Sequence, residues 1–411
     1  MGFWGKLKLW HKIVIGMVLG IIVGLVGGES AAYLKPLGTL FINLIKMLIV
    51  PLIFVSLVVG VMSMGNDLKK MGIIGGKTLG LYLLTTTIAV TIGLLFGTIL
   101  KPGKGVDIST AGEVQTSQFP GFIETIVNLV PKNPVYSLAQ GNVLQIIVFA
   151  MLIGIAISLT GEKGKPVANL FESMADVIYK LTAMVMQVAP IGVFGLMAWV
   201  VGEYGIGMML PLGKVIVGVY IACIIHIGIV ILGSVLLLGK LSPIKFLKGI
   251  ISPFTFAFVS TSSSGTLPLS ISAAQENLGI SRKISSFVLP LGATINMDGT
   301  AIYQGVTALF VAQAFGIELG FNQYIIIILT STLASIGTAG VPGAGLIMLS
   351  LVLTSVGLPI EGVAIIAGID RILDMARTCV NVTGDCMVAL VVGKSENEVD
   401  VNIFNQESAL K

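Results

Sequence analysis

Two short stretches, Ser263-Ser-Gly-Thr-Leu-Pro268 and Ser335-Ile-Gly-Thr-Ala-Gly-Val-Pro342, interrupt long apolar runs and share the pattern Ser-x-Gly-Thr followed by Pro. Glycine and proline are turn residues, and irregular backbone survives at membrane depth only against protein or a water-filled cavity. Each stretch precedes a long segment with Asn and Asp at its middle. Paired, interrupted segments in corresponding positions indicate internal repeats around a transporter binding site. The plain alternative is two apolar loops outside the membrane.

The composition is that of an integral membrane protein. Of the 411 residues, 55% are hydrophobic and 11% are charged, whereas soluble domains carry about 25% charged residues. The net charge is +4 and the basic residues are scattered, so we expect no nucleic-acid partner. The three cysteines have no metal-ligand spacing, and their odd number predicts neither a disulfide framework nor a zinc site.

Apolar runs long enough to cross a bilayer recur along the chain. A basic start before a short apolar run is also typical of a secretory signal, but no small-residue cleavage pattern follows it. We predict an all-α polytopic membrane protein with eight transmembrane helices, two re-entrant helical hairpins and inverted repeats. The spans cover roughly 13–26, 37–64, 73–99, 142–160, 178–201, 209–238, 284–315 and 359–393, and the hairpins cover 250–273 and 324–355.

Basic residues predict which side of the membrane each connection faces. Alternating spans place the basic groups of 6–12, 69–77, 163–165, 240–248 and 282–283 on one side. The positive-inside rule makes that side the cytoplasm. The run 250–273 then starts and ends in the cytoplasm, so it is predicted to turn back within the membrane. We expect a multi-pass protein of the inner (plasma) membrane with both termini in the cytoplasm.

The last span carries polar residues on one helical face. Their offsets from the first are 4, 7, 8, 11 and 15 residues; they are Asp370, Asp374, Arg377, Thr378, Asn381 and Asp385. A charge at the bilayer centre costs several kcal/mol and usually marks an ion or substrate path. A structural Asp374–Arg377 ion pair without a ligand is the alternative. The size of the cluster beside two interrupted segments favours a binding site.

Further oxygen-bearing residues suit a hard cation rather than a transition metal. They lie in Asn296-Met-Asp-Gly-Thr300 and in the third span, as Tyr82, Thr85 and Thr86. For Thr85 and Thr86, a hydroxyl that hydrogen-bonds back to its own helix is as strongly expected as a cation ligand. His226, in an apolar span, is expected to pack against other helices rather than to carry protons.

Charge arithmetic links the site to cations. If Asp370 and Arg371 cancel, the remaining charged residues of the face and of the preceding span sum to −2; these are Asp298, Asp374, Asp385 and Arg377. A buried charge of this size requires compensating cations. An acidic amino acid at −1 would then need about three monovalent cations for neutrality.

Four motifs resemble those of the glutamate/aspartate transporter family, the dicarboxylate/amino acid:cation symporters. In chain order they are Ser262–Pro268, Asn296–Thr300, Gly337–Gly343 and Asp374–Asp385, and the resemblance covers nearly the whole chain. It implies a secondary active symporter, not an enzyme, that takes up L-aspartate or L-glutamate with sodium ions by alternating access and needs no organic cofactor.

Other functions compete with this reading. A proton-coupled carrier, or a carrier of C4-dicarboxylates, would keep the same fold. Asp374 weighs against a C4-dicarboxylate because such a substrate has no amine to pair with it. A passive channel is a further alternative. An intramembrane aspartyl hydrolase using Asp298 and Asp385 would leave Arg377 and the hairpins unexplained.

The resemblance implies roles for single residues. Arg377 would bind the side-chain carboxylate and Asp374 the α-ammonium, while the rest of the substrate site would be Asn381, Thr378, Thr300, Ser263, Ser264, Val341 and Gly345. Three cation sites would use Asp385, Asn381, Gly292 and Asn296; then Thr294, Ser335, Ile336 and Thr338; then Asp298, Asn296, Tyr82, Thr85 and Thr86. Thr261 departs from several prokaryotic relatives, which carry arginine there, and Arg371 would supply that charge.

The resemblance also implies a homotrimer whose protomers each have a fixed and a moving part. The scaffold would comprise 1–72 (spans 1 and 2) and 101–205 (a loop with spans 4 and 5). The transport domain would comprise 73–100 (span 3) and 206–393 (span 6, both hairpins, spans 7 and 8). Residues 394–411 would form a cytoplasmic tail.

Overall fold

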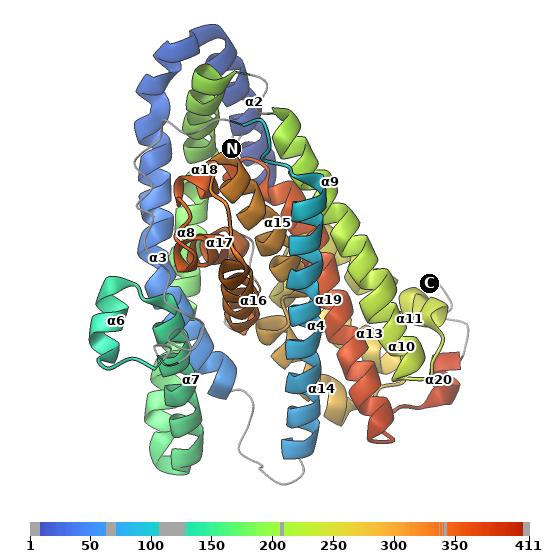
Figure 1. The fold of residues 1–411 in the computed structure, drawn as a ribbon. Helices are drawn as coiled ribbons and strands as arrows, with labels where there is room; N and C mark the ends of the chain where they lie inside the picture. Colours follow the sequence, from blue (N-terminus) through green and yellow to red (C-terminus); the bar gives the residue numbers. More distant parts are fainter. Residues whose placement is uncertain are drawn as a thin grey trace, which may run out of the picture.

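The computed structural model describes residues 9–62, 71–106, 127, 130–205, 209–336, 338, 340 and 343–405. Within these ranges the chain is helical and has no β-strand, only an isolated bridge between Ile280 and Val399. Four described stretches are long and apolar enough to span a membrane: His11–Phe41, Ile73–Leu100, Leu210–Leu237 and Asp370–Ser395. The all-α class is therefore confirmed (Figure 1).

Four long helices form one group. They are α2 (Leu9–Gly27), α3 (Lys35–Met62), α7 (Val143–Thr160) and α8 (Lys165–Tyr204). Two of them, α3 and α7, lie on the left of Figure 1. Short elements connect or flank the four helices, namely η1 (Gly28–Leu34), α6 (Pro134–Gln140) and η2 (Gly161–Gly164). The helix α8 begins well before the predicted run 178–201, because its first part carries exposed charged residues such as Glu172 and Asp176 that a hydropathy pattern omits.

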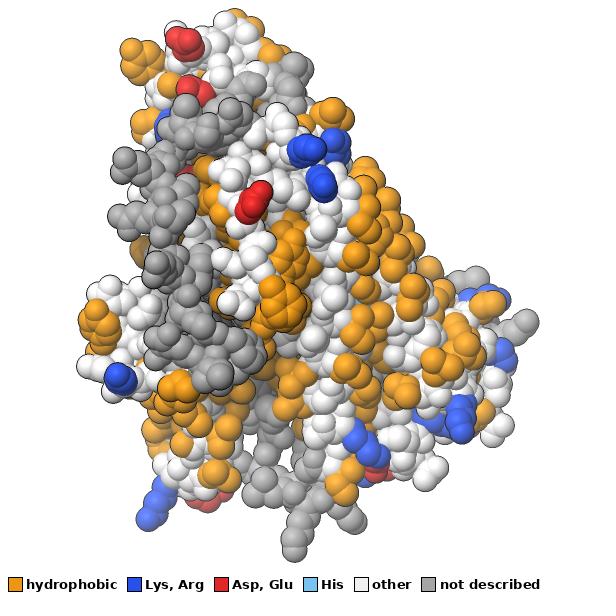
Figure 2. Space-filling model, viewed as in Figure 1, with side chains coloured by type: hydrophobic (Ala, Val, Ile, Leu, Met, Phe, Trp, Pro, Cys, Tyr) orange, Lys and Arg blue, Asp and Glu red, His pale blue; other side chains and the backbone are white. Residues whose placement is uncertain are grey.

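A second group surrounds the last span. It contains α4 (Met71–Leu100), α9 (Met209–Ile225) with the π-helix η4 (His226–Ile231) and α10 (Leu232–Leu237), α11 (Pro243–Gly249), and α19 (Asp370–Ser395). Apolar side chains remain exposed along α9, η4 and α10, among them Ile224, Ile229 and Leu237. Hydrophobic side chains, in orange, line this edge of the molecule in Figure 2. Such a surface suits lipid rather than water.

Two segments predicted as continuous are broken. The run 284–315 divides into α14 (Arg282–Ile295) and α15 (Asp298–Ala314), and the run 359–393 divides into α18 (Glu361–Ala367) and α19. The first break is stabilised by Ser335, whose hydroxyl donates to the carbonyl of Ile295 and accepts from the amide of Met297 at 3.0 Å. Buried backbone groups need such partners wherever a helix stops.

Two pairs of short helices occupy the predicted hairpin positions. They are α12 (Ile251–Ser260) with α13 (Ser263–Glu276), and α16 (Phe321–Ser335) with α17 (Ala344–Ser355), and the two arms of each pair contact each other. Thr261 turns the first pair in a left-handed conformation, with φ of 53°. The tips meet at the carbonyl of Gly340, which accepts from the Ser262 hydroxyl at 2.9 Å and the Ser264 amide at 3.1 Å.

The chain after α19 folds back onto the turn between α13 and α14. The amide of Ser281 donates to the carbonyl of Glu398 at 2.9 Å, and that of Asp400 donates to the carbonyl of Gly279 at 2.8 Å. The short helix α20 (Val401–Asn405) buries Phe404 and lies beside α11 (Figure 1). The first part of the predicted tail is thus a structured segment.

Candidate functional site

A cavity of about 240 Å³ lies where the hairpin tips meet α15 and α19. Six of the residues predicted to bind substrate line it: Ser263, Thr300, Gly345, Asp374, Thr378 and Asn381. Thr261, Met297, Thr338, Gly340 and Ala344 complete the lining. A cavity lined by hydroxyl, amide and carboxylate groups suits a small polar molecule.

Arg377 is almost completely buried beside this cavity. Its Nη1 is 2.9 Å from Asp370 Oδ1 and its Nη2 is 2.8 Å from Asp374 Oδ1. Its guanidinium carbon lies 4.2 Å from the centre of the Tyr303 ring, a cation–π contact. No described residue accepts a hydrogen bond from Nε. Both terminal nitrogens therefore have carboxylate partners within the protein.

This arrangement corrects the assumed pairing of Asp370 with Arg371. Asp370 pairs with Arg377 instead, because the two lie seven residues apart on one face of α19. Arg371 points toward the first hairpin tip, with Nη2 3.5 Å from the carbonyl of Ser260. The formal sum stays at −2 only when Arg371, which is partly buried, is counted with the buried charges. The position next to Thr261 agrees with the expectation that Arg371 supplies the local positive charge.

Glycine lets the neighbouring helices approach the guanidinium. A Cβ at Gly345 of α17 would lie 2.5 Å from Arg377 Nη1, and one at Gly299 of α15 would collide with the Arg377 backbone carbonyl. Any larger side chain at these two positions would displace Arg377. Gly345 thus belongs to the site through its lack of a side chain.

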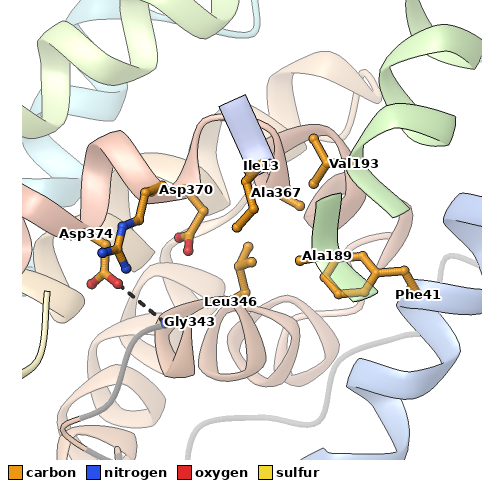
Figure 3. A pocket seen from close by; sticks show the side chains of 10 residues that line it. Ile13, Phe41, Ala189, Val193, Gly343, Leu346, Ala367, Asp370 and Asp374 are labelled. Carbon is orange, nitrogen blue, oxygen red and sulfur yellow. Dashed lines mark hydrogen bonds between the residues drawn. The ribbon is translucent and has the colours of Figure 1, made fainter. Parts of the chain in front are cut away.

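The charged end of the site also faces the first group of helices. A second cavity, of about 390 Å³, has Asp370, Arg371 and Asp374 on one side and an apolar wall opposite. That wall consists of Ile13, Phe41, Ala189 and Val193, from α2, α3 and α8 (Figure 3). The amide of Gly343, in the second hairpin, donates to Asp374 Oδ2 at 3.4 Å. One hairpin therefore touches both the site and the boundary between the two groups.

The first predicted cation set is brought together. Asn296 Nδ2 donates to Asp385 Oδ1 at 2.9 Å. A Cβ at Gly292 would lie only 2.5 Å from the Tyr82 hydroxyl and would collide with Asp385, so these residues share one small volume. The Oδ1 of Asn296 is buried and has no partner among the described residues. An unpaired acceptor beside a buried carboxylate fits a hard cation.

Asn381 lies between this region and the substrate cavity. Its Oδ1 accepts from the amide of Gly299 at 2.8 Å, and its Nδ2 lies 3.1 Å from the sulfur of Met297.

Asp298 forms a separate pair of contacts. Its Oδ1 accepts from the Thr86 hydroxyl at 2.6 Å, and its Oδ2 lies 3.0 Å from His226 Nε2.

Other predicted ligands bond locally. The hydroxyls of Thr85, Thr294 and Thr338 each donate to a backbone carbonyl three or four residues earlier. Thr85 and Thr86 thus follow opposite alternatives, since only Thr86 reaches a carboxylate.

Ser335 and Ile336 lie at the end of α16, beside the break before α15. Ser264 is exposed at the first hairpin tip, and Val341 lies outside the described residues.

Sequence reasoning missed two contributors to the site. Tyr303 was not considered, although it lies four residues before Thr307 and three after Thr300 on the buried helix α15. The expectation that His226 is a packing residue is incomplete, because its imidazole contacts a buried carboxylate. A histidine within an apolar span is itself the signal that could have indicated a polar partner.

In the described chain, no group of three or more His, Cys, Asp or Glu side chains is arranged to hold a metal ion. Ligands for a cation would therefore come mainly from amide, hydroxyl and backbone oxygens. This is the donor chemistry of a weakly held, hard ion rather than a transition metal.

Comparison with known proteins shows the family of the chain. The model of the sodium:dicarboxylate symporter family matches residues 9–395. The chain belongs to this family. It is 41% identical to a proton/sodium-glutamate symport protein of Geobacillus stearothermophilus, over 98% of this chain and 96% of that protein.

Two further relatives show the range within the family. A proton/glutamate-aspartate symporter of Escherichia coli (strain K12) is 39% identical, over 96% of this chain and 94% of the relative. A C4-dicarboxylate transport protein of Bacillus subtilis (strain 168) is 37% identical over the same shares of the two chains. The chain is therefore a membrane transporter of the symporter type and not an enzyme.

Proposed function

We propose that this protein is a secondary active symporter that takes up L-glutamate or L-aspartate together with sodium ions. The carrying observation is the buried guanidinium of Arg377, held between Asp370 and Asp374 at the edge of a small polar cavity. A guanidinium binds a carboxylate bidentately. An acidic side chain is therefore the group that this cation suits best.

Asp374 favours an amino acid over a simple dicarboxylate. It lines the cavity and pairs with Arg377 in the absence of substrate. An α-ammonium arriving at Asp374 would compensate that carboxylate while the guanidinium turns to the substrate. A substrate without an amine would separate the pair and leave Asp374 uncompensated in a buried site, which is costly. Relatives named for glutamate and for C4-dicarboxylates make this the decisive chemical difference.

Sodium coupling is supported by the other two buried carboxylates. Asp298 and Asp385 are both buried, and neither has a basic Lys or Arg partner in the described chain. Cations bound beside Asn296, Gly292 and Tyr82 would compensate them before the site closes. Because the cation ligand Asn381 also lines the substrate cavity, ion and substrate would bind cooperatively.

The proposed architecture follows the sequence prediction. The protein would have eight membrane spans and two re-entrant hairpins, in an inner membrane, with both termini in the cytoplasm. The group of α2, α3, α7 and α8 would be the scaffold of a homotrimer. The group around α19 would move against it, with the second hairpin tip acting as the external gate and with Ser264 and Val341 contributing to the substrate site. The apolar wall between the groups supports such sliding.

The test is uptake of radiolabelled amino acids into proteoliposomes under sodium and proton gradients imposed independently. We expect glutamate or aspartate to accumulate only with an inward sodium gradient, and succinate to compete weakly. Accumulation driven by a proton gradient alone would show that the protein is coupled to protons instead of sodium. Strong succinate transport would instead assign the protein to the C4-dicarboxylate carriers.

A further inference from the structure

The π-helix η4 places a histidine against one of the proposed cation ligands. His226 is the first residue of η4, and its side chain is fully buried. Its Nε2 lies 3.0 Å from Asp298 Oδ2, in a different helix. A π-turn inside a longer helix is uncommon and frequently marks a functional position. The local widening therefore coincides with a buried histidine that contacts a carboxylate.

Asp298 is held from two sides by side chains of other helices. Thr86 of α4 donates to one carboxylate oxygen at 2.6 Å, and His226 of η4 contacts the other. Each carboxylate oxygen has more than one lone pair, so both oxygens can still face a cation. The carboxylate cannot rotate without losing one of these two bonds. Its orientation is thus fixed by elements outside its own helix.

The second imidazole nitrogen identifies the donor. Nδ1 of His226 is buried and has no hydrogen-bond partner among the described residues. A hydrogen atom on Nδ1 would be an unsatisfied buried donor, whereas on Nε2 it is satisfied by Asp298. The favoured neutral form therefore carries its proton on Nε2 and donates to the carboxylate. A residue that only filled space would not need this bond.

We propose that His226 is a positioning residue for cation coupling, which orients the Asp298 carboxylate toward the ion through an Nε2–H hydrogen bond. This inference rests on the proposed function, in which Asp298 is a sodium ligand. Residues that hold a metal ligand in place commonly change metal affinity by about 10- to 100-fold when they are replaced. His226 would therefore set the sodium affinity without contacting sodium or the amino acid.

Three substitutions separate positioning from packing. In His226→Gln the amide nitrogen can occupy the place of Nε2, whereas in His226→Asn it corresponds to Nδ1 and falls short of Asp298. His226→Leu retains apolar volume and has no donor. Ile229→Leu, in the same π-turn but 70% exposed, is the matched control. For each purified variant, the sodium concentration giving half-maximal glutamate uptake is measured, followed by the glutamate KM at saturating sodium.

We expect the half-maximal sodium concentration to rise at least about tenfold in His226→Asn and His226→Leu. It should change less than about threefold in His226→Gln and in the control, and the glutamate KM at saturating sodium should be near that of the parent in every variant. If Leu does not fold, the comparison of Gln with Asn still decides.

Each other outcome is equally definite. Unchanged sodium dependence in Asn and Leu, or an equal rise in Gln, would overturn the positioning role while leaving sodium-coupled uptake intact. A parent protein whose uptake ignores sodium would overturn the proposed coupling itself, and the role of His226 with it.

Discussion

Two helix contacts in this molecule are built in opposite ways. The helix α2 packs on α8 through Gly16, Gly20 and Gly24, at each of which a Cβ would come within 2.7 Å of a backbone carbonyl of α8. The contact between α15 and α19 instead buries carboxylates, an amide and a guanidinium. Small residues allow close helix packing in membranes without any ligand. A buried net negative charge, by contrast, requires a bound cation to compensate it.

This difference assigns the two regions different dependence on substrate and ions. The α2–α8 contact is complete without either, so it suits a fixed frame. The α15–α19 region has acceptors such as Asn296 Oδ1 without a partner among the described residues, and under the proposed function its charge would change when ions and substrate bind. Substitutions in the first region should therefore change stability, and substitutions in the second should change ligand dependence.

The largest effect is expected from Arg377→Cys. The change leaves Asp370 and Asp374 buried side by side without their cation and removes the anchor for an acidic side chain. Losing one partner of a buried ion pair costs about 3–5 kcal/mol. We expect loss of glutamate and aspartate binding and a shift in preference toward small neutral amino acids. Binding by isothermal calorimetry measures this, and near-parental aspartate affinity would remove Arg377 from the site.

Asp385→Asn tests whether the same region is ion-dependent. The substitution keeps the shape of the side chain but removes the charge that contacts Asn296. We expect sodium and glutamate affinities to weaken together, by about 10- to 100-fold for sodium, because their coupling is reciprocal. Sodium titrations of glutamate binding give both values. An unchanged titration here and in Asp298→Asn would show that the cation sites lie elsewhere.

Much of this contrast could be predicted from the sequence, because it depends on residue type and spacing. The polar face of α19 was visible as a helical repeat, and the interrupted segments as Gly- and Pro-rich runs. The break between Ile295 and Asp298 was missed, since it depends on a hydroxyl from Ser335, some 40 positions away in the chain.

Pairing was the part that spacing alone could not settle. Asp370 is adjacent to Arg371 in the chain but pairs with Arg377, seven residues further along the same helical face. The contact between His226 and Asp298 joins helices 72 residues apart, and nothing local in the sequence specifies it. Long-range partners of buried polar groups follow from how the helices pack.

Gly20→Ala tests the fixed frame. A methyl group there would lie 2.6 Å from the Phe194 carbonyl and 2.9 Å from Met197 Cβ, so α2 must move away from α8. Overpacking of this kind costs about 1–3 kcal/mol. Gly213→Ala in α9 is the control, since no heavy atom outside its own surroundings lies within 4 Å. The unfolding temperature in detergent should fall for Gly20→Ala and not for Gly213→Ala, and the sodium affinity of both variants should be unchanged. A shifted sodium affinity in Gly20→Ala would contradict the assignment of the α2–α8 contact to a ligand-independent frame.

Ala344→Cys measures how ligands change the second hairpin. Ala344 lines the substrate cavity and is almost fully buried. In a background without Cys223, Cys379 and Cys386, we expect sodium with glutamate to slow its reaction with a thiol reagent several-fold, and sodium alone to slow it less. Val135→Cys, on the exposed face of α6, provides a ligand-insensitive control. Equal labelling with and without ligands would argue against a gate at this tip.

The smallest effect concerns the segment after α19, which is structured by surface contacts rather than by either kind of helix packing. Hydrogen bonds from Ser281 and Lys283, and the charge of Lys283, lower the pKa of Glu398 below its ordinary value. A carboxylate with a lowered folded-state pKa adds stability above its unfolded pKa, near 4.3, and that stability is lost as the pH falls through the folded-state pKa.

Glu398→Gln should therefore reduce the unfolding temperature slightly at pH 7, and the difference from the parent should disappear at a pH below the folded-state pKa. The Lys283–Glu398 contact is exposed, so salt should also weaken the effect. Differential scanning fluorimetry at two pH values and two salt concentrations measures both dependences. Sodium affinity should not change, because the contact lies outside the ion-dependent region; a parallel loss of sodium affinity would mean that this segment controls the site.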